Sequence, residues 1–363
     1  MKYIDAKNLS SKDYLDYLNQ LGGYSFFHTP EILKFYTESS LGKNLSFFCF
    51  EQDMVVGFVP LCIRTDQNKR DSFSFNESGC HLPVIKFNLS SRARKNYLKE
   101  IFSEIYRKFI KHNIKYVDFF YHPIRFNRDQ STYIDYKNSF QILNYLDVEV
   151  VTINLNLFDL KVNKEDFEGR FYPKLRQEFK KEKYKELNFK IIKIKNSNKE
   201  LVEKNFKEYK KFHFNSAGRL TRTEKSWDLM LNNILLGNAS LFIIKKNEID
   251  LSFLYCFEHK KYVFAASQVN TLDQNYLKKY NLRHFLEKMA IEHYKKNKFN
   301  YYEIGRTYFF DKNFKIFAEK QKRIGIGKLK FGADLLPIHY FRFSSKNKHI
   351  FAKDYKFIVE NEF

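Results

Sequence analysis

The same order of elements occurs twice in this chain: a β-hairpin, an amphipathic helix and a strand. Residues 45–63, LSFFCFEQDMVVGFVPLCI, predict a hairpin with a tight turn at Gln52 and Asp53, because β-favouring residues flank this polar pair. Residues 239–269 predict the same pattern with a third strand added. Segments that read as helix then strand follow at residues 97–120 and 285–305. We therefore expect a duplicated α/β domain, although two unrelated α/β domains would show the same order.

The segment 97–120 illustrates the periodicity behind these helices. Its apolar residues recur at steps of three and four and form one helix face: Leu98, Ile101, Phe102, Ile105, Phe109 and Ile110. The strands after the two helices place Asp118 and Glu303 at comparable points. A chain of 363 residues fits two domains of ordinary size. We predict a first domain over residues 1–155, a second domain with the catalytic cleft over residues 156–335, and C-terminal strands over residues 336–363 that can return to the first domain.

The chain is strongly basic. It contains 64 Lys and Arg against 42 Asp and Glu, which gives a formal net charge of +22. A hydrophobic content of 44% is enough for packed cores and excludes a wholly disordered protein. The heavy use of Lys, Asn and Phe is typical of a genome poor in G and C, so the lysine excess alone identifies no function. Physically, the charge still favours anionic partners, among them nucleic acids, nucleotide-linked substrates and an anionic membrane surface.

No segment predicts export or a membrane span. The four cysteines show neither a CxxC pair nor regular metal-ligand spacing, which favours a reduced compartment: Cys49, Cys62, Cys80 and Cys256. No run approaches about 18 uninterrupted apolar residues, and the N-terminal segment lacks the apolar block of a signal peptide. We expect a cytoplasmic protein without a transmembrane segment.

The most informative motifs lie in residues 301–337. They comprise an acidic residue before Gly-Arg-Thr and a lysine before Phe-Gly: Glu303, Gly305-Arg306-Thr307, Lys328 and Phe331-Gly332. Residues 26–40 predict a helix that starts at Thr29-Pro30, and residues 174–196 predict a basic helix that runs into a strand. Together these motifs resemble the FemAB-like branch of the GNAT acyltransferase superfamily. The resemblance implies an α/β (α+β) fold of two tandem GNAT-like domains, each a mixed, mainly antiparallel sheet flanked by helices.

The resemblance implies catalytic roles for Lys328 and Glu303. A fixed ammonium near the reacting carbonyl would stabilise the oxyanion that forms as an amine attacks an ester or thioester. The family usually has Phe directly before this lysine, whereas this chain has Gly327, so Lys330 is a second candidate. Either lysine can instead be an ordinary surface residue. Glu303 or Asp118 would take the proton from the attacking ammonium.

Four further residues are predicted to bind substrate: Arg306, Arg219, Arg176 and Tyr262. Arg306 belongs to the Gly-Arg-Thr motif. The family commonly has an arginine for acceptor phosphates in the region of residues 209–227, where Arg222 and Trp227 also occur, and we select Arg219. Arg176 lies among the nine basic residues of segment 174–196, which is either a solvated helix face or the wall of a basic groove. Tyr262 would line the cleft.

A glycine-rich segment near the C-terminus imitates a cofactor loop. Residues 322–329, KRIGIGKL, are similar to the RxxGxG loop with which ordinary GNAT enzymes hold coenzyme A on backbone N–H groups. The following Leu335-Leu336-Pro337 interrupts a helix, and residues 271–288, where the second domain should carry the loop, contain no glycine. We therefore predict no tightly bound cofactor. We also predict no metal site, and structural roles for His81 and His122.

The resemblance implies an amide-forming acyltransferase. In the Fem group the donor is an aminoacyl-tRNA and the acceptor a lipid- or nucleotide-linked muropeptide, so we expect transfer onto an amine of a cell-envelope or surface-glycan precursor. One alternative is an acetyl- or acyl-CoA-dependent N-acyltransferase that acts on an amino sugar in capsule or glycan biosynthesis. A third is a nucleic-acid-binding protein without enzymatic activity, which would account for charge and aromatic residues together.

Overall fold

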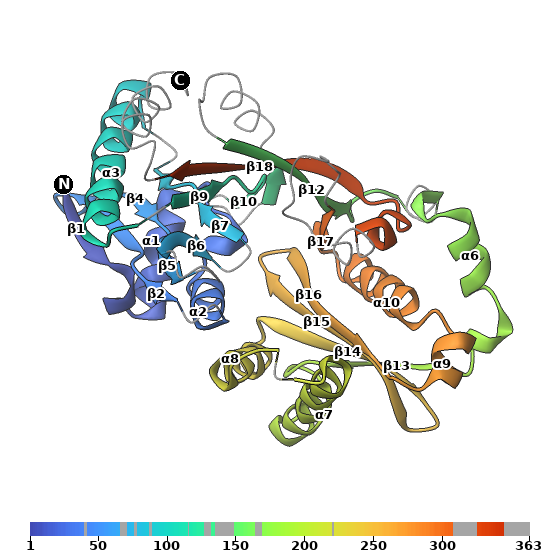
Figure 1. The fold of residues 1–363 in the computed structure, drawn as a ribbon. Coiled ribbons are helices and arrows are strands. Elements are labelled where there is room, and N and C mark those ends of the chain that lie inside the picture. Colours follow the sequence, from blue (N-terminus) through green and yellow to red (C-terminus); the bar gives the residue numbers. More distant parts are fainter. Residues whose placement is uncertain are drawn as a thin grey trace. The chain divides into compact units, whose positions relative to one another are not determined.

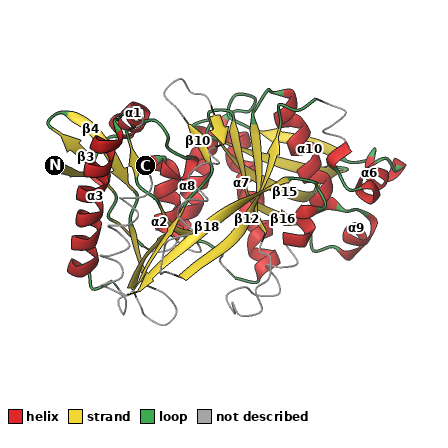
Figure 2. Cartoon of the chain, turned by 90° about the horizontal axis from the view of Figure 1, so that it is seen from above, coloured by secondary structure: helices red, strands yellow, loops and turns green. Residues whose placement is uncertain are grey.

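The computed structural model describes residues 1–39, 42–65, 71–75, 78–86, 89–114, 116–126, 132–134, 149–163, 169–219, 221–307 and 325–344. The chain divides into two compact units. One is formed by Met1–Ile153 together with the chain from Pro337 onward, and the other by Asn154–Leu336. Each unit combines mainly antiparallel strands with helices (Figures 1 and 2).

The first unit contains two groups of strands. One group has the order β1-β3-β4-β8, with bounds Lys2–Asp5, Phe47–Glu51, Met54–Val59 and Val84–Ile85. The other has the order β2-β5-β6-β7-β9-β18, with bounds Lys43–Asn44, Cys62–Thr65, Asp71–Phe75, Ser78–His81, Tyr116–Phe120 and Asp334–Ser344. A short hairpin joins β10 (Ile124–Phe126) to β11 (Thr132–Ile134). The helices are α1 (Ser11–Leu21), α2 (Pro30–Ser39) and α3 (Ser91–Lys111).

The predicted hairpin and helix of this unit are present. Strands β3 and β4 pair in antiparallel fashion around Gln52 and Asp53, and Gln52 adopts a positive φ of 52°. Helix α3 buries all of the predicted apolar face except Ile110, which is 49% exposed. That residue was wrongly assigned: it lies five positions after Ile105, which rotates it by roughly 140° away from that residue on a helix of about 3.6 residues per turn.

The described part of the C-terminal segment returns to the first unit. Strand β18 pairs with β9 in antiparallel fashion, from Tyr340 opposite Phe120 to Ser344 opposite Tyr116. Residues beyond Ser344 lie outside the described part of the chain. The first unit is therefore built from two separate stretches of sequence.

The second unit has one sheet with helices on both faces. The strand order is β13-β14-β15-β16-β17-β12, with bounds Asn188–Ile192, Ala239–Lys246, Ile249–His259, Tyr262–Asn270, Tyr301–Thr307 and Glu149–Asp159. Neighbouring strands are antiparallel except β16 and β17, which are parallel. Helices α7 (Lys199–Ala217) and α8 (Glu224–Leu235) cover one face, and α9 (Gln274–Lys279) and α10 (Leu282–Lys296) lie on the other (Figure 1).

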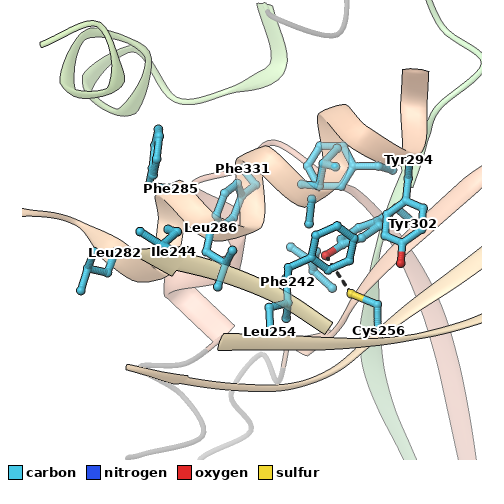
Figure 3. Packing of buried hydrophobic residues seen from close by; sticks show 14 of the residues in the cluster. Phe242, Ile244, Leu254, Cys256, Leu282, Phe285, Leu286, Tyr294, Tyr302 and Phe331 are labelled. Atoms are coloured by element: carbon cyan, nitrogen blue, oxygen red, sulfur yellow. Dashed lines mark hydrogen bonds between the residues drawn. The ribbon is translucent and has the colours of Figure 1, made fainter. Parts of the chain in front are cut away.

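The core of this unit lies between the sheet and α10. Figure 3 shows Phe242 and Ile244 of β14, Leu254 of β15 and Leu286 of α10 packed together. The repeated meander at residues 239–269 supplies β14, β15 and β16, as its β-favouring residues around polar turns predict. The predicted helix and strand after it are α10 and β17.

The predicted basic helix within residues 174–196 is shorter than expected. Helix α6 covers only Pro173–Phe179, a 3-10 turn follows at Glu182–Tyr184, and β13 comes next. Phe179 and Tyr184 both pack on the ring of Phe285, at centroid distances of 5.7 and 4.7 Å. Residues five apart lie on different faces of a continuous helix, so this shared contact requires the helix to end between them.

Two observations bear on the surroundings of the protein. Among the described helices, none is both long and apolar enough to cross a membrane. All four cysteines are buried, and none of them forms a disulfide bond: Cys49, Cys62, Cys80 and Cys256.

Candidate active site

A cavity lies where the parallel strands of the second unit stop pairing. Strands β16 and β17 pair only from Tyr262 opposite Tyr301 to Phe264 opposite Glu303. Beyond this point β16 continues along β15, and β17 continues along β12. The cavity has a volume of about 560 Å³ and is lined by residues 265–270 of β16, Ile304 of β17, Ser216 of α7, and Arg283 and Glu287 of α10. Because α7 and α10 cover opposite faces of the sheet, the cavity extends through the sheet layer here.

Lys328 forms part of the cavity wall. It lies on a short helical turn over residues 325–329, and its ammonium approaches the backbone of β17 at Gly305. A Cβ atom at position 305 would lie only 2.6 Å from Lys328 Nζ, and Gly305 also has a positive φ of 88°. Only glycine satisfies both conditions without strain. The glycine of the predicted Gly-Arg-Thr motif is thus what lets the lysine reach this strand.

The Phe331-Gly332 pair anchors the turn that carries Lys328. Phe331 is buried, and its ring lies 6.1 Å from Phe171 and 5.1 Å from the ring of His284. Gly332 has a φ of 69°, and a Cβ there would lie 2.0 Å from the carbonyl oxygen of Arg170. A side chain at Gly332 would therefore collide with backbone. The packing of this turn therefore explains both residues of the Phe331-Gly332 motif.

The surroundings of Lys328 shift the pKa of its ammonium. Burial lowers the pKa of its ammonium to about 8, and the Glu287 carboxylate is the nearby charge that opposes this shift most strongly. Within the described part of the chain, the ammonium has no hydrogen bond and no ion pair within 4 Å. Lys330, the second candidate, is exposed to solvent, and its carbonyl accepts a hydrogen bond from the Tyr172 N–H at 3.0 Å.

Glu303 and Tyr262 lie together beside the cavity. Both are fully buried, and the Tyr262 hydroxyl donates a hydrogen bond to Glu303 Oε2. Neither belongs to the described residues that line the cavity. Arg306 is half-buried on β17, and its charge contributes to the lowered pKa of Lys328. The structure therefore brings three of the predicted site residues close to Lys328, with Glu303 already engaged by a tyrosine.

Sequence reasoning did not select Glu287. This residue is 8% exposed, lines the cavity and accepts a hydrogen bond from the Tyr302 hydroxyl at 2.5 Å. Burial raises the pKa of its carboxyl. A signal was available, because Glu287 shares the buried stripe of α10 with Ile291 and Tyr294, four and seven positions later. An acidic residue in an apolar helix stripe is uncommon without a partner.

The arginines predicted to bind phosphate are not at the cavity. Arg219, just after α7, and Arg176, on α6, are both exposed. Arg222 instead contacts the cavity wall: its guanidinium lies 4.9 Å from the Trp227 ring and donates to Ser267 Oγ at 3.0 Å. Ser267 lines the cavity and also contacts His213 Nε2 at 3.1 Å.

The charges around Arg222 favour an anion. Burial and the neighbouring guanidinium lower the pKa of His213 to about 3, so the imidazole is neutral at pH 7. In the part of the chain that the structure describes, no carboxylate forms an ion pair with Arg222. A half-buried guanidinium that stacks on an aromatic ring and faces only neutral groups can bind a carboxylate or phosphate.

Several predicted features lie elsewhere. The Asp118 side chain and residues 308–324, which include the start of the KRIGIGKL segment, are outside the described residues, whereas residues 325–329 of that segment are helical. His81 and His122 are buried in the first unit and contact the ring of Phe27, at 4.9 Å each. Among the described residues, no group of His, Cys, Asp or Glu could hold a metal ion.

Comparison with known proteins identifies the fold. No family model matches the chain, and neither does any curated protein. Among solved structures, FemX is similar with a TM-score of 0.57 at 10% identity, covering 98% of this chain and 100% of FemX. This chain has a FemX-like fold.

Two further structures agree with that fold. The C-terminal domain of a protein assigned as a lysylphosphatidylglycerol synthetase, from Agrobacterium fabrum, gives a TM-score of 0.55 at 12% identity, with 98% of each chain covered. L-PGS from Bacillus licheniformis gives 0.51 at 10% identity, covering 89% of this chain and 95% of that one. The prediction of a mixed, mainly antiparallel α+β fold is confirmed, and the chain forms two compact units.

Proposed function

We propose that this protein is an acyltransferase that forms an amide in the cavity between β16 and β17. An amine attacks an activated ester or thioester, and the Lys328 ammonium stabilises the oxyanion that develops. The observation that supports this role is the placement of Lys328 on the cavity wall, without an ion-pair partner among the described residues. A positive charge held ready in a partly dry site stabilises a developing negative charge far better than one in water does.

The proposed donor is an aminoacyl-tRNA, and the proposed acceptor an amine on a cell-envelope or surface-glycan precursor. Structures named FemX and lysylphosphatidylglycerol synthetase share the fold, and this supports aminoacyl transfer over other acyl transfers. The net charge of +22 would speed association with tRNA and make that association sensitive to salt. The same charge would attract the protein to an acceptor at an anionic membrane surface.

For the acceptor we propose that Arg222 takes the role that the sequence suggested for Arg219. Its planar guanidinium can donate two hydrogen bonds to one phosphate, and Trp227 and Ser267 hold it in place. Arg306 would add positive charge near Lys328. Arg219 and Arg176, being exposed, would contribute only to long-range attraction of anionic substrates.

The test is transfer from defined donors to defined amines. Purified protein is incubated with tRNA charged with labelled amino acids, or with acetyl-CoA, and with glucosamine 1-phosphate or Nα-acetyllysine amide. We expect aminoacyl transfer that weakens as salt rises. Lys328→Ala should reduce kcat/KM by about 100-fold or more, while Lys330→Ala, the matched control, should change it little. Arg222→Ala should raise KM for the phosphorylated amine by about 10-fold, and Arg219→Ala should not.

Each other outcome selects a different function. Consumption of acetyl-CoA without any transfer from tRNA would favour the acyl-CoA-dependent N-acyltransferase. Tight tRNA binding without transfer, unaffected by Lys328→Ala, would favour a nucleic-acid-binding protein. Equal losses for Lys328→Ala and Lys330→Ala would contradict the oxyanion role.

A further inference from the structure

The chemistry of amide formation requires a proton acceptor at the cavity. An alkyl amine is an ammonium at neutral pH and cannot attack a carbonyl until it loses a proton. Among the described residues that line the cavity, Glu287 is the one carboxylate. Glu303, the predicted acceptor, is engaged by the Tyr262 hydroxyl and is not among those lining residues.

A chain of buried groups fixes one oxygen of Glu287 and leaves the other available. The Tyr302 hydroxyl donates to Glu287 Oε1 at 2.5 Å, and the Tyr302 oxygen lies 3.8 Å from Cys256 Sγ (Figure 3). Burial raises the pKa of both Tyr302 and Cys256, so each keeps its proton near neutral pH. The thiol therefore donates to the tyrosine and the tyrosine to the carboxylate. Glu287 Oε2 has no hydrogen-bond partner in the described part of the chain.

Two positively charged groups face Glu287 and favour its ionised form. Lys328, from the turn at residues 325–329, and Arg283, one turn earlier on α10, both oppose the effect of burial on its pKa. The same two cations line the cavity. Burial raises the pKa of this carboxyl, and a carboxylate with a raised pKa is a better base than an exposed glutamate.

We propose that Glu287 is the catalytic base that deprotonates the attacking ammonium, with Tyr302 as its positioning residue. This inference rests on the proposed function. The ammonium gives one proton to Glu287 Oε2, and the free amine nitrogen forms a C–N bond to the acyl carbon. The carbonyl electrons move to oxygen, beside Lys328. As they return, the bond from carbon to the leaving oxygen or sulfur breaks, and the proton held by Glu287 neutralises that leaving group. The freed Glu287 carboxylate then takes the second proton from the nitrogen and passes it to solvent, which leaves a neutral amide.

Two amines distinguish a base from a merely structural residue. Nα-acetyllysine amide presents an ammonium at neutral pH, whereas the nitrogen of methoxyamine is already unprotonated. Aminoacyl-tRNA is the donor, and transfer is measured above the enzyme-free rate for wild type, Glu287→Gln and Tyr302→Phe. Glu292→Gln is the matched control, because Glu292 lies on the same helix, pairs with Lys288 and does not line the cavity. Thermal unfolding verifies that each variant is folded.

We expect Glu287→Gln to lose about 100-fold or more in kcat with the lysine amide and far less with methoxyamine. Tyr302→Phe should lose less than Glu287→Gln and show a shifted acidic limb in its pH profile. Equal losses with the two amines, or none, would overturn the role of Glu287 while leaving Lys328 intact. If Lys328→Ala also has no effect with either amine, the proposed function itself fails.

Discussion

Both compact units contain a strand-helix-strand element with a parallel strand pair. They differ in what lies at the end of that pair. In the first unit, β7 and β9 pair in parallel, and rings fill the space beside them: His81 lies 3.7 Å from Phe120, and Phe27 stacks on His81 at 4.9 Å. In the second unit, β16 and β17 pair over three residues, and the space beyond them is the cavity of about 560 Å³.

This difference shows what separates a structural copy of the element from one suited to chemistry. Aromatic and histidine rings pack against one another in the first unit. Small residues on β16, together with Lys328, Arg283 and Glu287, leave space and surround it with charge. The same backbone arrangement therefore serves stability in one unit and, in our proposal, catalysis in the other.

The largest effect is expected from removing an aromatic ring beside β7 and β9 in the first unit. Phe120 is fully buried, and Phe120→Ala should lower the free energy of unfolding by about 3–5 kcal/mol, measured by urea denaturation. Phe214→Ala is the matched control, because Phe214 is 49% exposed and should cost less than about 1 kcal/mol. Similar small losses for both variants would show that the ring cluster is not a tightly packed core.

The next largest effect is expected from placing a large side chain in the cavity of the second unit. Ala266 lines the cavity, and Ala266→Phe should reduce kcat/KM by about 100-fold, because the new ring occupies the space proposed for substrate. Ala217→Phe, at an exposed position of α7, should leave activity unchanged. Full activity of the Ala266 variant would place the reaction elsewhere.

A smaller effect is expected on the free energy of unfolding at acidic pH, because of His28 in the first unit. Burial, aided by Arg125 and His122, lowers the pKa of His28 from 6.5 to about 3. The folded state thus binds fewer protons than the unfolded state between these values, so stability is complete above pH 6.5 and falls as the pH drops toward 3. At pH 5 the loss from this residue should be about 2 kcal/mol.

The measurement is urea denaturation of wild type and His28→Gln at pH 7 and pH 5. The glutamine cannot be protonated, so the variant should lose about 2 kcal/mol less than wild type between the two pH values. An identical loss in both proteins would mean that His28 is accessible to protons in the folded state.

Local patterns in the sequence predicted the elements well. The hairpins follow from β-favouring residues around a polar pair, and α3 and α10 follow from helical spacing. Both are properties of neighbouring residues. One misjudged feature depends on a distant partner and the other on helix geometry. The basic helix ends early because Phe179 and Tyr184 share Phe285, more than a hundred positions later, and Ile110 is exposed because it lies off the buried stripe of α3.

The candidate site was predictable only in part for the same reason. Lys328 could be selected because its motif has local requirements, a glycine pair and a buried Phe331. Arg222 differs from Arg219 only by its contacts with Trp227 and Ser267, which no spacing rule reveals. Glu287 acquires its environment from β17 and from the turn at Lys328, so its location on α10 gave only a weak signal.

The strand β18 has a consequence for how the chain is made. It pairs with β9, yet it lies after the whole of the second unit in the sequence. During synthesis, the edge of β9 that β18 covers stays open until residues 340–344 leave the ribosome. An open strand edge can pair with other chains. The first unit is therefore translated first but completed last. A chain that stops before Tyr340 would leave this edge of β9 unpaired and prone to aggregation.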